Sequence, residues 1–464
     1  MSAEVNLPAR LVPAIMRAAF EGNSEAGAWL LFRTISIASD PWTHMARKKL
    51  ILLDVIPLTV GDIESSSHTH LTLRTESFVK LLKHAQMNDL VPGFLHGHPS
   101  GHAGFSQRDN ENESALSKAA QNRNGDCTQL VSILALPDGS MMARLWESPD
   151  NAYDIRILTS GNTKHLLSRE ATTSQTVSRL DRQARVFGEE FNQVLSELRI
   201  TVVGAGGTGS PLAIMLARSG VGNLAVIDPD IVEASNLHRL HGATTKHIGH
   251  PKSEVLVNHI HSLGLEVDAT YLVGNILEAK YRDLMKASDI IFCATDDHAG
   301  RMMLNRFAYF YETLVIDLGL AVEPAGSRPV CDMTGRVTLV YPGAPCLLCR
   351  NIIDPRRARE EELMRLSPEE YAEQQRDGYL LGGGNPEPAF ISMTTSIACM
   401  ALEELAHIIS SFRGNKRVIN QRLRRFQIPE DRCSGGTPDE SCPICASREY
   451  WGIGDVMPFL DRVG

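Results

Sequence analysis

Hydrophobic residues form short, uninterrupted runs in the second half of the chain. Residues 200–203 (ITVV) and 224–227 (LAVI) have the length of buried parallel strands, and residues 210–218 between them have the apolar spacing of a helix that ends at Gly220. Four glycines fill the turn after the first run: Gly204, Gly206, Gly207 and Gly209. The pattern predicts a β-α-β unit whose glycine turn lies at a helix N-terminus, a place suited to an anionic phosphate.

The N-terminal half shows more mixed patterns. Residues 11–20 and 76–86 have the apolar spacing of helices, whereas residues 49–57 and 71–74 are typical of strands. Polar residues 151–176, rich in Ser, Thr and Asn, predict a joint between two domains, with the boundary near residues 165–175.

Composition narrows the class of protein. A chain of 464 residues is too long for one compact core, so two or three domains are expected. The net charge of −9 argues against a protein that binds the phosphate backbone of nucleic acids. Neither a signal peptide nor an apolar run of transmembrane length is recognisable, so we expect a cytoplasmic protein that contacts neither membranes nor nucleic acid.

The segment FLHGHPSGHAGFSQRD carries residues suited to metal chemistry. His96 and His98 alternate, so on an extended backbone both point to one side, and Asp109 completes a three-ligand zinc set with an open position for water. Zinc lowers the pKa of that water to about 7. Glu25 is the candidate base, and Ser106 is placed to donate a hydrogen bond to a developing oxyanion.

Two blander interpretations of this segment stay open. In the first, His96 and His98 are ordinary strand residues without a metal. In the second, the domain has the intact fold but only binds its partner and catalyses nothing. A second histidine pair, His68 and His70, has no carboxylate at ligand spacing and is expected to be exposed.

Cysteines predict a second metal site of another kind. Two C-x-x-C pairs each supply half of a tetrahedral thiolate site: Cys346 with Cys349, and Cys442 with Cys445. Four thiolates close the coordination shell, so zinc held here is expected to be structural.

Charged residues follow the glycine turn in a fixed order. They are Asp228, Asn236, Arg239, Lys252, Asp296 and Asp297. An NAD site needs neither an arginine and a lysine directed at phosphates nor a carboxylate at a strand end, whereas ATP with magnesium needs both. A Rossmann oxidoreductase is therefore less favoured.

The ordered set GAGGTG, DPD, NLHR, PK and TDD, over residues 178–451, resembles the adenylation domain of the ThiF/MoeB and ubiquitin-activating enzyme family, in which Asn stands in place of Asp297. The resemblance implies that the glycine loop cradles phosphate and that Asp228 holds the ribose. It also implies that Asn236, Arg239 and Lys252 contact phosphates and that Asp296 holds magnesium. The family has the same two cysteine pairs.

Residues 178–188 resemble an arginine-bearing segment of the same family. There the second arginine, which matches Arg182, reaches the phosphates of the partner subunit, and this implies a homodimer. The alternative is a charged helix face with surface ion pairs, which is less favoured because the other ATP motifs are present.

Residues 10–150 resemble the JAMM/MPN metallopeptidases, whose pattern is Glu, then H-x-H-P, seven residues to Ser, then S-x-x-D. Family members cleave peptide or isopeptide bonds after the C-terminal glycine of ubiquitin-like proteins. By position, the resemblance assigns zinc to His96, His98 and Asp109, transition-state stabilisation to Ser106, and the base to Glu25.

Together these features predict an α/β protein in three parts: a JAMM-like α/β domain over residues 1–165, a linker and arginine-bearing segment over residues 166–195, and a Rossmann-like adenylation domain with a four-cysteine zinc site over residues 196–464. The expected cofactors are ATP, Mg²⁺ and two zinc ions, one catalytic and one structural. The expected partner is a ubiquitin-like protein ending in glycine, with a conjugating protein or sulfur donor downstream. A non-enzymatic scaffold for ubiquitin-like proteins and a zinc-ribbon nucleic-acid binder are less favoured.

One family feature is missing from the sequence. Conjugating members carry a thioester-forming cysteine on a crossover loop, which would fall at residues 380–386, and residues 350–398 contain no cysteine. The nearest thiols are Cys331 and Cys399, and Cys399 lies on the apolar face of a predicted helix, where a thiol is a poor nucleophile. We therefore expect the reaction on this chain to stop at the adenylate.

Overall fold

The computed structural model describes residues 2–20, 26–66, 71–167, 178–323, 332–376, 389–414, 419–428, 430–456 and 459–460. The chain divides into two compact units. The N-terminal unit comprises Met1–Ser39, Met45–Thr173 and Trp451–Gly454, and the C-terminal unit comprises Asp40–His44, Ser174–Tyr450 and Asp455–Gly464. Within the described residues, no helix combines the length and the apolar character needed to span a bilayer.

The N-terminal unit is built on strands that close into a barrel in the order β1-β3-β2-β6-β7-β8-β9, with β1 parallel to β9. The strands are β1 (Ser2–Pro8), β2 (Gly27–Ile37), β3 (Arg47–Pro57), β6 (Val91–Gly97), β7 (Leu130–Ala135), β8 (Met141–Ser148) and β9 (Asn151–Ser160). A separate hairpin pairs β4 (Ile63–Ser66) with β5 (Leu71–Leu73). The helices are α1 (Val12–Ala19), α2 (Thr75–Met87) and α3 (Gln107–Asn124).

Strand β2 is buried on both faces because alternate side chains enter two different cores. Ala28, Leu30 and Phe32 pack with α1 in one core. Trp29 and Leu31 pack with α2 and α3 in the other. Since successive side chains of a strand point to opposite faces, an uninterrupted apolar run is what such a doubly covered strand requires.

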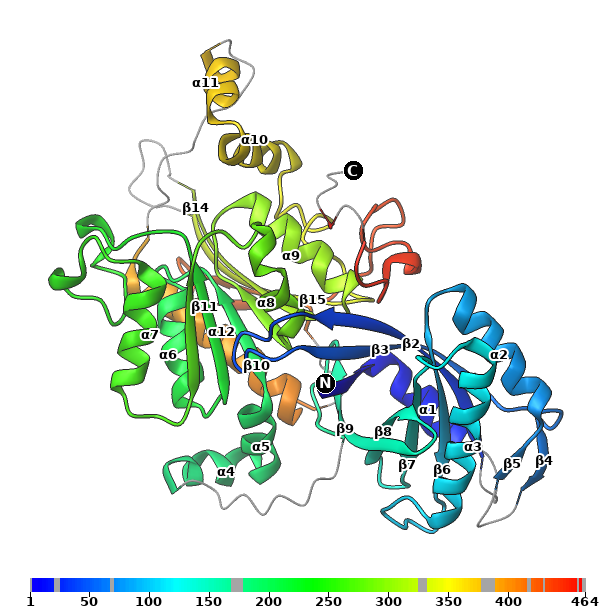
Figure 1. Ribbon diagram of the computed structural model, residues 1–464. Helices are drawn as coiled ribbons and strands as arrows, with labels where there is room; N and C mark the ends of the chain where they lie inside the picture. The colour runs from blue at the N-terminus through cyan, green and yellow to red at the C-terminus, as the bar shows by residue number, and fades with distance from the viewer. Residues whose placement is uncertain are drawn as a thin grey trace. The chain divides into compact units, whose positions relative to one another are not determined.

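The C-terminal unit contains an eight-stranded sheet in the order β12-β11-β10-β13-β14-β15-β16-β17 (Figure 1). The strands are β10 (Arg199–Val203), β11 (Asn223–Asp228), β12 (Asp268–Val273), β13 (Ile290–Cys293), β14 (Leu314–Glu323), β15 (Asp332–Val340), β16 (Gln421–Arg425) and β17 (Glu430–Ser434). Strands β10 to β14 are parallel, and β15 to β17 continue the sheet antiparallel.

Helices cover both faces of this sheet. Helices α6 (Gly209–Arg218), α7 (Lys252–Ser262) and α12 (Ile391–Ser410) pack together on one face, while α8 (Arg282–Ala287) and α9 (His298–Phe310) cover the other (Figure 1). This is the arrangement that right-handed β-α-β crossovers produce. The remaining helices are α4 (Asp181–Phe187), α5 (Glu189–Glu197), α10 (Pro355–Leu366) and α11 (Pro368–Arg376).

The predicted β-α-β unit is confirmed, as β10, α6 and β11, and the mixed α/β fold with a Rossmann-like C-terminal unit follows from it. The predicted helices at residues 11–20 and 76–86 correspond to α1 and α2, and the strand at residues 49–57 corresponds to β3. The assignment of residues 1–165, 166–195 and 196–464 to separate activities stays a prediction.

We predict that Gly222→Ala destabilises the C-terminal unit. A Cβ on Gly222 would lie 1.9 Å from the backbone carbonyl oxygen of Ser196, so β11 and the end of α5 would have to separate. We expect a loss of about 1–3 kcal/mol in the free energy of unfolding, measured by urea denaturation. The matched control is Gly435→Ala, whose Cβ meets no atom within 4 Å. Equal stability of the two variants would contradict this account of the packing.

Candidate functional sites

The glycine turn after β10 is set by close backbone contacts. Gly204 has a φ of +100°, and a Cβ there would lie 2.7 Å from the carbonyl oxygen of Ala294. A Cβ on Gly209 would lie 1.8 Å from the carbonyl oxygen of Gly204. Gly206 differs, because a Cβ there meets no atom within 4 Å. The turn therefore packs tightly against its own unit on one side and leaves open space on the other.

That open space is a cavity of about 400 Å³ at the carboxyl ends of the parallel strands. The structure brings most of the predicted nucleotide-binding residues together in its lining: Gly204, Gly206, Gly207, Asp228, Arg239, Lys252 and Asp296. Cations, exposed backbone and carboxylates thus share one cavity, and this combination suits a nucleotide triphosphate with its metal ion.

Three predicted residues lie outside this lining. Gly209 packs against Gly204, as described above. Asn236 is buried, and its Oδ1 accepts a hydrogen bond of 3.0 Å from the backbone N–H of Glu233, which caps a short 3-10 helix (Ala234–Asn236). Arg182 is exposed on α4. Direct contact of Asn236 and Arg182 with phosphate stays a prediction.

Asp228 and Lys252 are already held by neighbours in the cavity. The Asp228 carboxylate accepts hydrogen bonds from the backbone N–H of Ala205 at 2.6 Å and of Asp230 at 2.8 Å. Burial raises the pKa of Asp228, and these two amide hydrogens oppose the shift. Lys252 Nζ lies 2.8 Å from Asp230 Oδ2. The Lys252 ammonium is thus paired with Asp230 at the edge of the cavity, and its contact with phosphate stays a prediction.

Two adjacent aspartates, Asp296 and Asp297, follow β13, and their side chains make different contacts. Asp296 lines the cavity. Asp297 caps α9, since its Oδ2 accepts from the backbone N–H of Gly300 at 2.5 Å, and it also bonds the hydroxyl of Thr295. Asparagine and aspartate cap helices about equally well. The change from the family's Asn to Asp297 therefore keeps the cap and adds a negative charge.

Arg301 is a cavity residue that the sequence pattern did not reveal. Its Nη1 donates to the backbone carbonyl of Asp296 at 3.1 Å, and its Nε lies 3.1 Å from Asp317 Oδ1. The buried Asp317 also pairs with Arg336 at 2.6 Å. The available signal was the position of Arg301 one helical turn after Asp297, because such a side chain projects near the start of its helix.

A cluster of two histidines and one aspartate forms in the N-terminal unit. His96 lies on β6, His98 follows the strand, and Asp109 comes from the first turn of α3. Asp109 Oδ1 lies 3.3 Å from His96 Nε2, and Oδ2 lies 3.4 Å from His98 Nε2. The three ligand atoms all lie within 4.8 Å of one another. The alternation of His96 and His98 thus does bring both rings to one side.

The surroundings of the cluster fit a bound zinc ion. Both ring nitrogens of His96 lack a hydrogen-bond partner although the residue is only 2% exposed. His98 Nδ1 lies 3.0 Å from the carbonyl oxygen of His102, so Nδ1 carries the proton and Nε2 presents a lone pair. Buried imidazoles without partners are rare, and a metal ion satisfies them. Burial raises the pKa of Asp109, but the nearby His96 and His98 rings and the hydrogen bond from the Ser106 amide outweigh it and leave that pKa well below its usual range.

Of the two remaining residues in the predicted peptidase set, the structure describes Ser106 but not Glu25. Ser106 is the N-cap of α3, and its Oγ accepts from the backbone N–H of Asp109 at 3.2 Å while Asp109 Oδ2 accepts from the Ser106 N–H at 2.7 Å. Its hydroxyl hydrogen is not used by that bond. Glu25 lies outside the described residues, as do His68 and His70.

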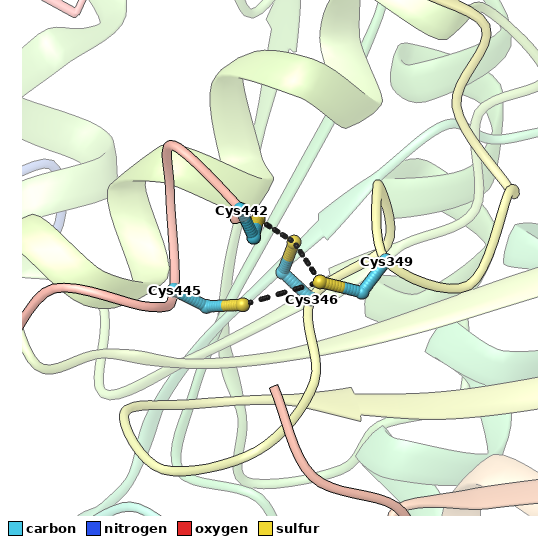
Figure 2. Close-up of side chains that lie close together, drawn as sticks. All are labelled: Cys346, Cys349, Cys442 and Cys445. Atoms are coloured by element: carbon cyan, nitrogen blue, oxygen red, sulfur yellow. Dashed lines mark hydrogen bonds between the residues drawn. The ribbon is translucent and has the colours of Figure 1, made fainter. Parts of the chain in front are cut away.

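Four cysteines from segments far apart in sequence meet in the C-terminal unit (Figure 2). Their Sγ atoms are separated by 3.8 Å between Cys346 and Cys349, 3.6 Å between Cys346 and Cys442, and 3.4 Å between Cys349 and Cys445. Disulfide sulfurs lie about 2.0 Å apart. Thiolates at about 2.3 Å from a tetrahedral zinc ion lie about 3.8 Å apart. The spacing therefore fits the expected zinc site.

Comparison with known proteins agrees with the nucleotide cavity. The model of the ThiF family matches residues 180–444, which is more than half of the chain. The chain belongs to the ThiF family. The histidine cluster lies outside the matched residues.

ThiF relatives include the SAMP-activating enzyme E1 of Haloferax volcanii, 30% identical over 38% of this chain and 64% of that protein. The adenylyltransferase and sulfurtransferase MOCS3 of Arabidopsis thaliana is 32% identical over 35% of this chain and 33% of that one. The adenylyltransferase and sulfurtransferase UBA4 of Yarrowia lipolytica is 33% identical over 39% of this chain and 44% of that one. The chain thus spans between one third and just under two thirds of these relatives.

Among solved structures, E. coli MccB with ATP aligns at a TM-score of 0.44 and 17% identity, covering 58% of this chain and 75% of that one.

We predict a pH-dependent contact between α10 and the start of α9. Glu361 Oε2 accepts from the backbone N–H of Ala299 at 2.8 Å. Burial raises the pKa of Glu361 to about 7, and the charges of Asp297 and Asp296 add to the shift. Because burial raises the folded pKa above its ordinary value, the docked position of α10 is most stable when Glu361 is protonated, although the hydrogen bond from Ala299 opposes the shift. The contact is expected to weaken from about pH 4.5 to about pH 7.

Hydrogen exchange of residues 355–366, corrected for intrinsic pH dependence, measures this effect. Protection in the wild type should fall between about pH 4.5 and about pH 7 and level off above that, and Glu361→Gln should abolish the slope. The control is Glu373→Gln, which removes an exposed carboxylate on α11. A slope that persists in Glu361→Gln would assign the effect to another group.

Proposed function

We propose that this chain activates the C-terminal carboxylate of a ubiquitin-like protein in its C-terminal unit and hydrolyses the bond after that terminal glycine in its N-terminal unit. The observation that carries the first activity is the cavity in which the glycine turn, Arg239, Lys252 and Asp296 meet in a ThiF-family chain. The name of the SAMP-activating relative supports a small protein as the substrate class.

In the adenylation step, a carboxylate oxygen of the substrate attacks the α-phosphate of ATP, and pyrophosphate leaves. The open side of the glycine turn receives the phosphates, and Arg239 and Lys252 neutralise the charge that develops on them. Asp228, at the end of β11, would hold the ribose. Asp296 would hold Mg²⁺, which supplies further neutralisation of the phosphates.

The hydrolytic activity uses the histidine cluster, which resembles the JAMM/MPN pattern. His96, His98 and Asp109 would hold a zinc ion, which when bound supplies an activated water. The Ser106 hydroxyl, with its oxygen engaged by the α3 cap, has its hydrogen available for a developing oxyanion. Glu25 is the proposed base. Cleavage would expose the glycine carboxylate that the second activity needs.

The proposed active form is a homodimer in which Arg182 completes the cavity of the other subunit. Arg182 is exposed and lies outside the lining of its own cavity, which agrees with a role across an interface. A conjugating or sulfur-donating protein would then receive the acyl group from the adenylate.

We further propose that no thioester forms on this chain. Burial raises the pKa of the Cys399 thiol, whose Sγ lies 3.8 Å from the sulfur of Met215. A thiol that stays protonated at neutral pH is a poor nucleophile. Cys331 and residues 380–386 lie outside the described residues.

We predict that Asp109→Ala or His98→Ala removes hydrolysis without affecting adenylation, because the two sites lie in different units. The substrate is ubiquitin, or SAMP of Haloferax volcanii, carrying a fluorogenic amide on its terminal glycine. The zinc content, measured by metal analysis, should fall from about two ions per chain to about one. His102→Ala is the control, since the variant keeps the backbone carbonyl that His98 contacts. Loss of ATP–pyrophosphate exchange together with hydrolysis would contradict separate sites.

We predict that Asp296→Ala and Arg182→Ala each abolish ATP–pyrophosphate exchange, and that mixing the two variants restores part of it. One site of a mixed dimer has both residues intact, so random exchange of subunits should restore about one quarter of wild-type activity. Arg185→Ala is the control, because Arg185 lies on the same helix and pairs with Asp181. If mixed dimers form, as checked by native mass spectrometry, and activity does not return, Arg182 does not act across the interface.

A further inference from the structure

A buried carboxylate lies beside the histidine cluster. Glu113 is fully buried on α3, one helical turn after Asp109. Its Oε2 accepts hydrogen bonds from Arg144 Nε at 2.6 Å and from Trp146 Nε1 at 2.9 Å. Its Oε1 has no hydrogen-bond partner.

The unsatisfied oxygen faces an unsatisfied nitrogen. Glu113 Oε1 lies 4.0 Å from His96 Nδ1, which also lacks a partner and is also buried. A buried polar atom without a partner costs about 1–3 kcal/mol. The gap exceeds hydrogen-bond length by about 1 Å, which a small side-chain rotation closes.

We propose that Glu113 is the positioning residue of His96. Its Oε1 accepts a hydrogen bond from the protonated Nδ1 of His96, and this bond holds the Nε2 lone pair toward Asp109 and His98. This inference rests on the proposed zinc site. It assigns the proton of His96 to Nδ1, the same tautomer that the carbonyl of His102 fixes in His98.

Hydrogen bonds from Arg144 and Trp146 hold the Glu113 carboxylate in place. Arg144 balances its charge, donates also to Asn110, and lies with its guanidinium carbon 3.9 Å from the centre of the Phe105 ring and 4.9 Å from that of Trp146. An ionised carboxylate is a stronger acceptor for an imidazole N–H than a neutral amide.

Helix α3 supplies both the metal ligand and the positioning residue. Asp109 and Glu113 are four residues apart and therefore project from the same face of the helix. The capping box at Ser106 fixes where the helix begins. The position of this helix thus sets the placement of Asp109 and of His96 together.

The test is cobalt and zinc binding by the metal-free full-length protein, compared between wild type, Glu113→Gln and Glu111→Gln. Glu113→Gln keeps the shape of the side chain and removes its charge. Glu111→Gln makes the same chemical change on the exposed side of α3. Charge-transfer bands of cobalt bound to thiolates report the cysteine site separately, and His96→Ala identifies the metal bound at the histidine cluster.

Glu113→Gln should lower metal affinity at the histidine cluster by about 10–100-fold. The cysteine-site bands and the affinity of Glu111→Gln should stay as in the wild type. An affinity within about twofold of wild type would overturn the role of Glu113 while leaving the zinc site intact. Absence of any His96-dependent metal in the wild type would overturn the proposed site and this inference together.

Should Glu113→Gln fail to fold, nitrogen NMR of the zinc-loaded wild type decides the question. The inference predicts a protonated Nδ1 and a metal-bound Nε2 on His96. Metal on Nδ1, or an Nδ1 hydrogen that exchanges as fast as that of an exposed histidine, would overturn it.

Discussion

The nucleotide cavity depends on the close approach of three backbone segments at the end of β10. Gly204 lies against Ala294 at the end of β13, and Gly209 lies against the carbonyl of Gly204, so that no side chain fits at either position. This contact brings the start of α6 to the sheet. The residues that follow β11 and β13 then surround one cavity, into which Gly206 opens. A fold that lost this contact would separate Asp228 from Asp296, although both residues would remain in the chain.

The parts of the molecule predicted from sequence are those that follow from local spacing. The apolar runs of β10 and β11 and the glycines between them specify a β-α-β unit without reference to the remainder of the chain. The H-x-H spacing likewise brings His96 and His98 to one side of a short segment. In both cases the relative positions of the residues follow from the backbone conformation of a few neighbouring residues.

The parts that sequence did not reveal depend on contacts between distant segments. Glu361 meets Ala299 across 62 residues of sequence, and Glu113 meets Arg144 across 31. The cap that the Asn236 side chain makes with the backbone N–H of Glu233 is likewise visible only in the structure, and the contact of Asn236 with phosphate stays a prediction. The membership of Asp40–His44 in the C-terminal unit and of Trp451–Gly454 in the N-terminal unit depends in the same way on packing, which no local pattern encodes.

The two candidate metal sites differ in the chemistry that their ligands allow. The cysteine set offers four thiols, enough to close a tetrahedral shell, and joins two segments 96 residues apart. The histidine set offers three ligands and leaves a position for water. Metal at the first site would therefore stabilise the ThiF fold, while metal at the second would keep an open coordination position, which the proposed hydrolysis needs.

The central claim is that the open side of the glycine turn receives the phosphates of ATP, and calorimetric titration with Mg²⁺ and a non-hydrolysable ATP analogue tests it most directly. A Cβ on Gly206 meets no protein atom within 4 Å and Gly206 lines the cavity, so we expect Gly206→Val to fold while filling the phosphate position. We expect its affinity to fall by at least about tenfold, equivalent to about 1.4 kcal/mol, whereas Gly435→Val should bind as the wild type does. Unchanged binding by a folded Gly206→Val protein would contradict the account.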